Sequence, residues 1–290
     1  MKRIFPLLLG GLLLAAPIQG QEKPLPSLYG TGVWNADSLG NHRVVVSVDQ
    51  PSDAVLALIQ WRRKDFNPEN KDLIVIDAKT GKRITNVCRF QINREKGEVV
   101  FQPQTVPGDY YIYYLKNISS GSKYYPTVTY PGFEETASAE WKKAPELPQA
   151  TVKQFQAINE FHSFYPMEVI ATAKEKDDLL KSQPEDPYIL FTEDRRYPIR
   201  MTTDLPYKWI EDNRHDSFEG TADKGEYYTF QIGLWAARKD VNHLKLTYCA
   251  LVNSQTGESI PASAFTCFNT GGVDVTGSVF EKDCSVPKGK

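Results

Sequence analysis

The chain has few of the residues that most often hold metals or act as nucleophiles. It contains four histidines and four cysteines in 290 residues. No two histidines lie at metal-ligand spacing, and the intervals between Cys249, Cys267 and Cys284 fit no zinc-binding pattern. Neither a nucleophile-elbow motif nor a glycine-rich phosphate loop between a strand and a helix is present. The sequence therefore predicts no metal centre and no cofactor.

The scarcity of cysteine leaves the question of disulfides open. Cys88 lies in an apolar segment and is predicted to be a buried thiol. An even number of cysteines in an exported chain permits disulfides, and three of the four lie after residue 248. Because spacing does not fix a pairing, both a bridge among Cys249, Cys267 and Cys284 and three reduced thiols remain open.

The sequence also lacks a strong net charge and a second long apolar run. It begins with Lys2 and Arg3 and is then apolar to Pro17, which predicts a cleaved signal peptide over 1–20. Its removal leaves 32 basic against 36 acidic residues, a mild charge of about −4 that argues against nucleic acid or an anionic membrane as partner. We expect no membrane span and no lipid anchor, and a mature protein in the periplasm or outside the cell.

What the sequence does have is a series of short strand patterns between residues 29 and 131. These runs are rich in β-branched and aromatic residues, recur about every ten residues and are separated by glycine turns such as the one at Gly81. This spacing is typical of an antiparallel β-sandwich, immunoglobulin-like or jelly-roll-like. The expected strands are 40–48, 55–61, 73–77, 84–92, 98–103 and 110–114.

The pattern changes after residue 131. Val152, Phe155, Ile158 and Phe161 recur at helical spacing, so we predict a helical connector over 132–182. Strand patterns return after it and predict a second β-sandwich over 183–290, incomplete at its C-terminal end, in a chain that is a fragment or a truncated gene product. The predicted fold is mainly all-β, with two antiparallel β-sandwich modules joined by the connector. The expected later strands are 188–192, 227–236, 244–252, 263–268 and 273–280.

Five stretches together resemble the N-terminal part of secreted Bacteroidetes proteins similar to glycoside hydrolase family 123. They are LGNHR at 39–43, QWRRKD at 60–65, FQPQT at 101–105, PGDYY at 107–111 and FTCFNTGGVD at 265–274. The resemblance implies two β-rich modules in front of a (β/α)₈ barrel. In that family the barrel hydrolyses terminal N-acetylgalactosamine with help from the substrate's acetamido group, through an adjacent Asp-Glu pair.

The chain departs from the family at this catalytic pair. No aspartate is followed by glutamate, no barrel pattern is present, and the pairs at 185–186, 193–194 and 211–212 run in the reverse order. No catalytic residue is therefore carried over. We predict the non-catalytic N-terminal region of an exported, N-acetylgalactosaminidase-type enzyme, which supports or positions a C-terminal barrel on glycan and is inactive alone. The alternative is an independent carbohydrate-binding or surface interaction module.

Aromatic side chains provide the remaining candidate site. Exposed Trp or Tyr rings flanked by polar groups form platforms for sugars. Trp209 has such neighbours, so the candidate carbohydrate-binding residues are Trp209, Tyr207, Arg214 and His215. Trp61 continues an apolar strand face and is predicted to be core. The acidic and basic residues of 193–196 predict a surface salt-bridge patch.

Overall fold

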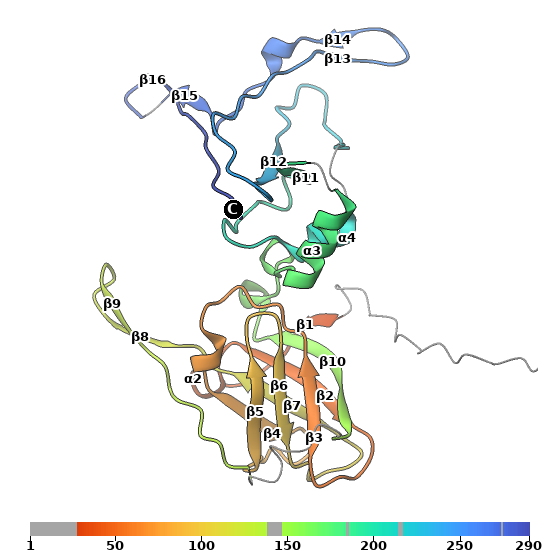
Figure 1. The fold of residues 1–290 in the computed structure, drawn as a ribbon, viewed down its shortest axis with the longest axis vertical. Coiled ribbons are helices and arrows are strands. Elements are labelled where there is room, and N and C mark those ends of the chain that lie inside the picture. Colours follow the sequence, from red (N-terminus) through yellow and green to blue (C-terminus); the bar gives the residue numbers. More distant parts are fainter. Residues whose placement is uncertain (1–27, 138–146, 184–185, 214–216, 274) are drawn as a thin grey trace, which may run out of the picture.

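The computed structural model describes residues 28–137, 147–183, 186–213, 217–273 and 275–290. A β-rich first part and a second part that begins after residue 160 lie one above the other in Figure 1, connected by the segment that follows β10 (Gln149–Ala157). The predicted signal peptide over 1–20 lies outside the described residues. Within the described ranges, no helix has the length and apolar character needed to cross a membrane.

Eight strands of the first part form one hydrogen-bonded sheet. Its order is β4-β7-β2-β10-β3-β6-β5, and β1 pairs with β10 outside this path. Neighbouring strands are antiparallel, except that β10 runs parallel to β1 and to β3. The other seven strands are β1 (Tyr29–Thr31), β2 (His42–Val48), β3 (Val55–Ile59), β4 (Leu73–Asp77), β5 (Val87–Ile92), β6 (Gly97–Phe101) and β7 (Gly108–Tyr114).

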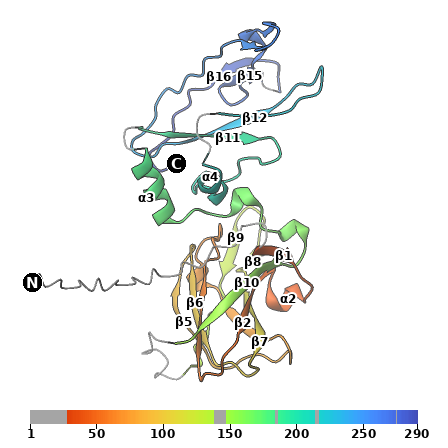
Figure 2. The same cartoon turned by 90° about the vertical axis from the view of Figure 1, so that its right-hand side faces the viewer.

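The sheet encloses the main core of the first part, because β10 changes partner along its length. Gln149 and Ala150 pair with β3, whereas the residues from Thr151 onward pair with β2. In Figure 2, β5 and β6 lie on one side of β10 while β2 and β7 lie on the other. Alternate side chains from both halves meet in the core, as the strand period of two requires. They include Val44, Val46, Val55, Ala57, Val75, Val99, Phe101, Tyr110, Ile112 and Phe155.

The helix predicted from Val152 to Phe161 is wrong, because most of this stretch belongs to β10. The pairing of β10 with β2 shifts register between Val152 and Gln154, which marks a bulge of one extra residue. The bulge lengthens the step between successive core-facing residues, Val152 and Phe155, from two to three. An apolar spacing of three was therefore mistaken for a helix, and the first sheet reaches beyond its predicted end at residue 131.

Short elements fill the connections. The hairpin of β8 and β9 extends away from the sheet, and every residue in its strands is exposed. The elements here are α2 (Ala36–Leu39), η1 (Pro68–Asn70), β8 (Ile118–Gly121), β9 (Pro126–Thr129), η3 (Glu160–His162) and η4 (Pro166–Glu168).

The second part starts with two helices and a two-stranded sheet around a smaller core. The last part of the connector predicted over 132–182 does contain a helix, α3 (Ala173–Ser182), which begins with a capping box between Thr172 and Glu175. α4 (Tyr207–Asp212), β11 (Ile189–Asp194) and β12 (Phe230–Trp235) complete this unit. Its core contains Met167, Ala171, Leu179, Ile189, Phe191, Leu205, Trp209 and Ala237.

The predicted second sandwich is not confirmed. Beyond the β11–β12 pair, the described residues form two more separate pairs, β13 with β14 and β15 with β16. The strand expected over 263–268 is wrong, since a 3₁₀ turn and loop occupy it, and the one expected over 244–252 is reduced to two residues. The elements are β13 (Leu251–Val252), β14 (Ser259–Ile260), η5 (Ala262–Ala264), β15 (Gly271–Val273) and β16 (Val279–Glu281).

Candidate functional site

The main candidate site is the joint between the two parts, where chain segments distant in sequence meet. The loop after β3 carries Arg62, whose carbonyl accepts a hydrogen bond from the backbone N–H of Ile170 at 3.2 Å. Ile170 in turn bridges to Pro206, and the Ala171 N–H donates to the Leu205 carbonyl at 2.8 Å. These bonds connect the loop after β3, the segment before α3 and the segment before α4, so backbone contacts between three chain segments form the joint.

A bidentate ion pair forms the centre of the joint. The guanidinium of Arg62 donates to both carboxylate oxygens of Glu175, with Nη1–Oε2 at 2.7 Å and Nη2–Oε1 at 2.6 Å. Arg62 also lies over the Tyr207 ring at 3.8 Å and donates to the Ile170 carbonyl at 3.3 Å. The side chain of Arg62 is 7% exposed and that of Glu175 is 22% exposed. Two parallel hydrogen bonds between largely buried groups fix the relative orientation of the guanidinium and the carboxylate as well as the distance between them.

The backbone of Arg62 is adapted to this contact. Its φ of 48° lies in the left-handed region, which a residue with a long side chain seldom adopts. In this conformation its N–H donates to the Glu95 carbonyl at 3.2 Å, while its carbonyl and its guanidinium both serve the joint. A sparsely populated backbone conformation that is maintained by several surrounding contacts is typical of functional positions.

A second ion pair lies beside the first. Arg94, from the turn between β5 and β6, donates to both oxygens of Asp204 at 2.9 and 2.7 Å. From the same turn, the Glu95 carboxylate accepts the backbone N–H of Ala173, at the first position of α3, at 2.7 Å. An anion at this end of a helix is favoured by the unpaired N–H groups and the helix dipole. Two bidentate pairs and one capped helix therefore connect the parts.

The electrostatics of the joint favour its ionised form. Burial alone would raise the pKa of Glu175, but the hydrogen bonds from Arg62 and Thr172 outweigh it, and the pKa lies below its ordinary value. Burial likewise opposes the charge on Arg62, yet the Glu175 carboxylate raises the pKa of its guanidinium. Both groups thus carry full charge at neutral pH, and each compensates the other's burial.

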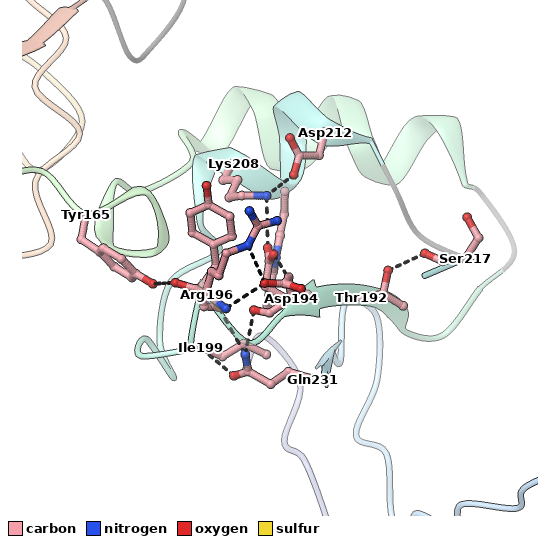
Figure 3. A network of polar contacts seen from close by, with 12 residues as sticks. Tyr165, Thr192, Asp194, Arg196, Ile199, Lys208, Asp212, Ser217 and Gln231 are labelled. Carbon is pink, nitrogen blue, oxygen red and sulfur yellow. Dashed lines mark hydrogen bonds and ion pairs between the residues drawn. The ribbon is translucent and has the colours of Figure 1, made fainter. Parts of the chain in front are cut away.

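A second polar network surrounds β11 and is drawn in Figure 3. Asp194 accepts hydrogen bonds from the Arg196 side chain and from the Tyr228 hydroxyl, each at 2.7 Å. The bond from Tyr228 is the largest influence that lowers the pKa of Asp194. Together with the pair of Arg195 and Glu226, these contacts form the surface patch predicted over 193–196.

Glu193 departs from that prediction, because it is buried rather than solvated. Its side chain is 4% exposed, accepts from the Trp209 indole N–H at 3.2 Å and pairs with Lys208 at 3.3 Å. Glu193 and Asp194 are successive residues of one strand, so their carboxyl groups point to opposite faces. Glycoside hydrolysis needs two carboxyl groups that face the same bond, and this pair is not so arranged. Among the described residues, no group of three His, Cys, Asp or Glu side chains is placed to hold a metal ion.

The structure places the predicted sugar platform in the core of the second part. Trp209 is 6% exposed, and its ring is stacked on Phe191 with centroids 4.5 Å apart and planes 5° apart. A Cβ on Gly233 would lie 2.4 Å from the same ring, so glycine is required on the neighbouring strand. Because Trp209 is nearly fully buried, with one ring face on Phe191 and Gly233 close to the ring, it offers no open surface to a sugar.

Of the other three candidate residues, the structure describes only Tyr207. Tyr207 lies against Arg62 in the joint, and Arg214 and His215 lie outside the described residues. The prediction that Trp61 is core is confirmed, since it is 1% exposed. Sequence reasoning missed the partnership of Arg62 with Glu175; the one available signal was the capping box of Thr172 and Glu175, which indicates a helix start but not its distant arginine.

These observations define a mainly β protein of two parts, joined through buried and half-buried ion pairs. Residues 32–158 match the family model described as glycoside hydrolase 123, N-terminal domain. The match ends one residue after β10, so it covers β2 to β10 and supports a domain of this kind over the first part. No curated protein and no solved structure matches the chain.

Proposed function

We propose that this chain is the non-catalytic N-terminal region of an exported enzyme of the glycoside hydrolase 123 type, and that its first part is a β-sandwich. Its task is to hold a C-terminal (β/α)₈ barrel, which acts on terminal N-acetylgalactosamine, in a fixed position relative to glycan. The family match over 32–158 supports the first half of this proposal. The signal-peptide pattern at the N-terminus supports export.

The single observation that carries the positioning role is the joint between Arg62 and Glu175. Domains within one chain move relative to one another unless their interface restrains them. Here a bidentate pair, a second pair between Arg94 and Asp204, and backbone hydrogen bonds restrain the two parts at once. A domain that only tethered its neighbour would need none of these contacts. A domain that sets the orientation of the next domain needs them all.

The inactivity of the chain alone is the first test. We expect no release of nitrophenol from a panel of nitrophenyl glycosides that includes the N-acetylgalactosaminide, because the acidic pair of β11 faces two ways and no adjacent Asp-Glu pair exists. A commercial N-acetylhexosaminidase in the same plate serves as positive control. Turnover that co-elutes with the folded chain on size exclusion and disappears on its denaturation would overturn the proposal.

The positioning role is tested by measuring how far the two parts move relative to one another. Small-angle scattering of the wild type and of Glu175→Gln compares the spread of distances between the parts. We expect one narrow distribution for the wild type and a broader one for the variant. A wild-type profile that requires many arrangements of the two parts would count against positioning, whatever the enzyme assay shows.

A further inference from the structure

Two cysteine thiols meet at one turn in the C-terminal segment. The Cys284 thiol donates to the backbone carbonyl of Asn269 at 3.5 Å, and the backbone N–H of Asn269 donates to the Cys267 sulfur. The turn is held in place by the β15–β16 pairing, which the bond from the Lys282 N–H to the Thr270 carbonyl at 2.9 Å extends by one step. Both sulfurs therefore contact the same residue, one at its N–H and the other at its carbonyl.

The third cysteine of this region is placed differently. Cys249 is exposed, whereas Cys267 and Cys284 are half-buried. Its neighbour Tyr248 approaches Cys267 and hydrogen-bonds to that sulfur. Cys267 and Cys284 thus both contact Asn269, and the side chain that reaches Cys267 from the neighbourhood of the third cysteine is a tyrosine.

The surroundings of Cys267 also favour its reactive form. Burial would raise the pKa of this thiol, but hydrogen bonds from Thr270, from the backbone of Asn269 and from Tyr248 lower it. The thiolate is the species that attacks a disulfide, so Cys267 is the better placed of the two to react first.

The segment has a structural use for a covalent link. The strands β13 and β14, the described positions of β16 and most of the loops around them are exposed, and the residues of β15 are exposed or half-buried. A two-stranded ribbon is marginal in water without a core, and small exported units compensate with disulfides. A bond that closes the loop from 267 to 284 would restrict the unfolded chain and so stabilise the ribbon.

We propose that Cys267 and Cys284 are a disulfide site, formed by exchange with a small-molecule or protein disulfide in an oxidising compartment. The Cys267 thiolate attacks one sulfur of the oxidant disulfide and expels one thiolate, leaving a mixed disulfide. The Cys284 thiol then gives up its proton and attacks the Cys267 sulfur, which expels the second thiolate. Two protein thiols are oxidised to one bond and the oxidant is reduced to two thiols, so electrons balance.

The test uses the whole chain equilibrated in a glutathione redox buffer and then blocked with iodoacetamide. Digestion with trypsin and a glutamate-specific protease separates the three cysteines onto residues 246–258, 259–281 and 283–288. We expect mass spectrometry to find 259–281 linked to 283–288, and thiol titration to fall from four to two per chain. The linked mass must vanish on reduction.

Cys249→Ser and Cys284→Ser serve as matched variants. The first keeps the link and should lose it only on reduction, whereas the second should retain all three of its thiols. In the wild type, a link from 246–258 to either other peptide, or three alkylated peptides under oxidising buffer, overturns the proposal. Since these readouts count bonds and not glycosidase activity, they stand or fall independently of the proposed function.

Discussion

Glu175→Gln is the sharpest perturbation of the joint, because it removes one charge and almost no volume. Glutamine can still take part in the capping box with Thr172, so α3 keeps its start. The partner of Arg62 is what changes. One carboxylate oxygen becomes an amide NH₂ that faces a guanidinium, so a donor meets a donor and the buried arginine loses its counter-ion.

The expected cost depends on the burial of the pair. Breaking a fully buried ion pair by removing one partner costs about 3–5 kcal/mol, whereas an exposed pair contributes less than about 1 kcal/mol. Arg62 is 7% and Glu175 22% exposed, so the pair lies between these limits. We expect the variant to be about 2 kcal/mol less stable at pH 7. With a slope of about 2–3 kcal/mol/M, the urea midpoint should fall by about 0.7–1 M.

The pH dependence of unfolding gives a second, independent test of the contribution of the Arg62–Glu175 pair to stability. Because the pKa of Glu175 in the folded protein is lower than its ordinary value of 4.5, the contribution of the pair is complete above that ordinary value. It is lost as the pH falls through the lowered folded value. The difference in unfolding free energy between wild type and variant should therefore be constant from pH 6 to 8 and shrink below about pH 4.5.

Asp177→Asn is the matched control. It removes the same charge from the same helix at an exposed position, so its midpoint should lie within about 0.2 M of the wild type. If Glu175→Gln unfolds together with this control at pH 7, or if the gap between them persists unchanged at pH 3, the joint is not held by this pair and the reasoning fails.

Two further predictions concern the packing of each part. Gly233→Ala should destabilise the second part by about 1–3 kcal/mol and change the near-ultraviolet circular dichroism of Trp209, because the new Cβ would lie 2.4 Å from that ring. The control is Gly132→Ala, which has open space around it and should change the melting temperature by less than about 1 °C. Tyr110→Phe should cost about 1–3 kcal/mol in urea unfolding, because the buried hydroxyl donates to the Thr105 carbonyl at 2.6 Å and accepts two backbone N–H groups; an unchanged midpoint would show that water replaces these bonds without loss.

The strands of the first sheet were predictable because their side chains alternate without interruption. Val44, Val46 and Val48 on β2 recur in the core with a period of two. Tyr110, Ile112 and Tyr114 do the same on β7, which pairs with β2. β10 was missed because a bulge breaks this period by one residue, and no local feature distinguishes a bulged strand from a helix turn. The extent of the first part was therefore recognisable only once the pairing partners of β10 were known.

The candidate site was less predictable than the sheet. Trp61 and Trp209 both stand beside arginine or lysine in the sequence, and both are core in the structure. Flanking polarity could not distinguish an exposed ring from a buried one, since Lys208 beside Trp209 turns to Glu193 while the ring packs on Phe191. A lysine or arginine can bury its apolar stem and still keep its charged end paired or in water, so its presence does not show that the adjacent ring is exposed.

Strand period, turn chemistry and composition are properties of neighbours along the chain, so the sequence alone determined that the protein is mainly β and that Trp61 is core. Pairing between distant residues depends on which surfaces the folded chain brings together. Only the tertiary structure therefore decided that Arg62 binds Glu175 across the joint and that Cys267 and Cys284 share one turn.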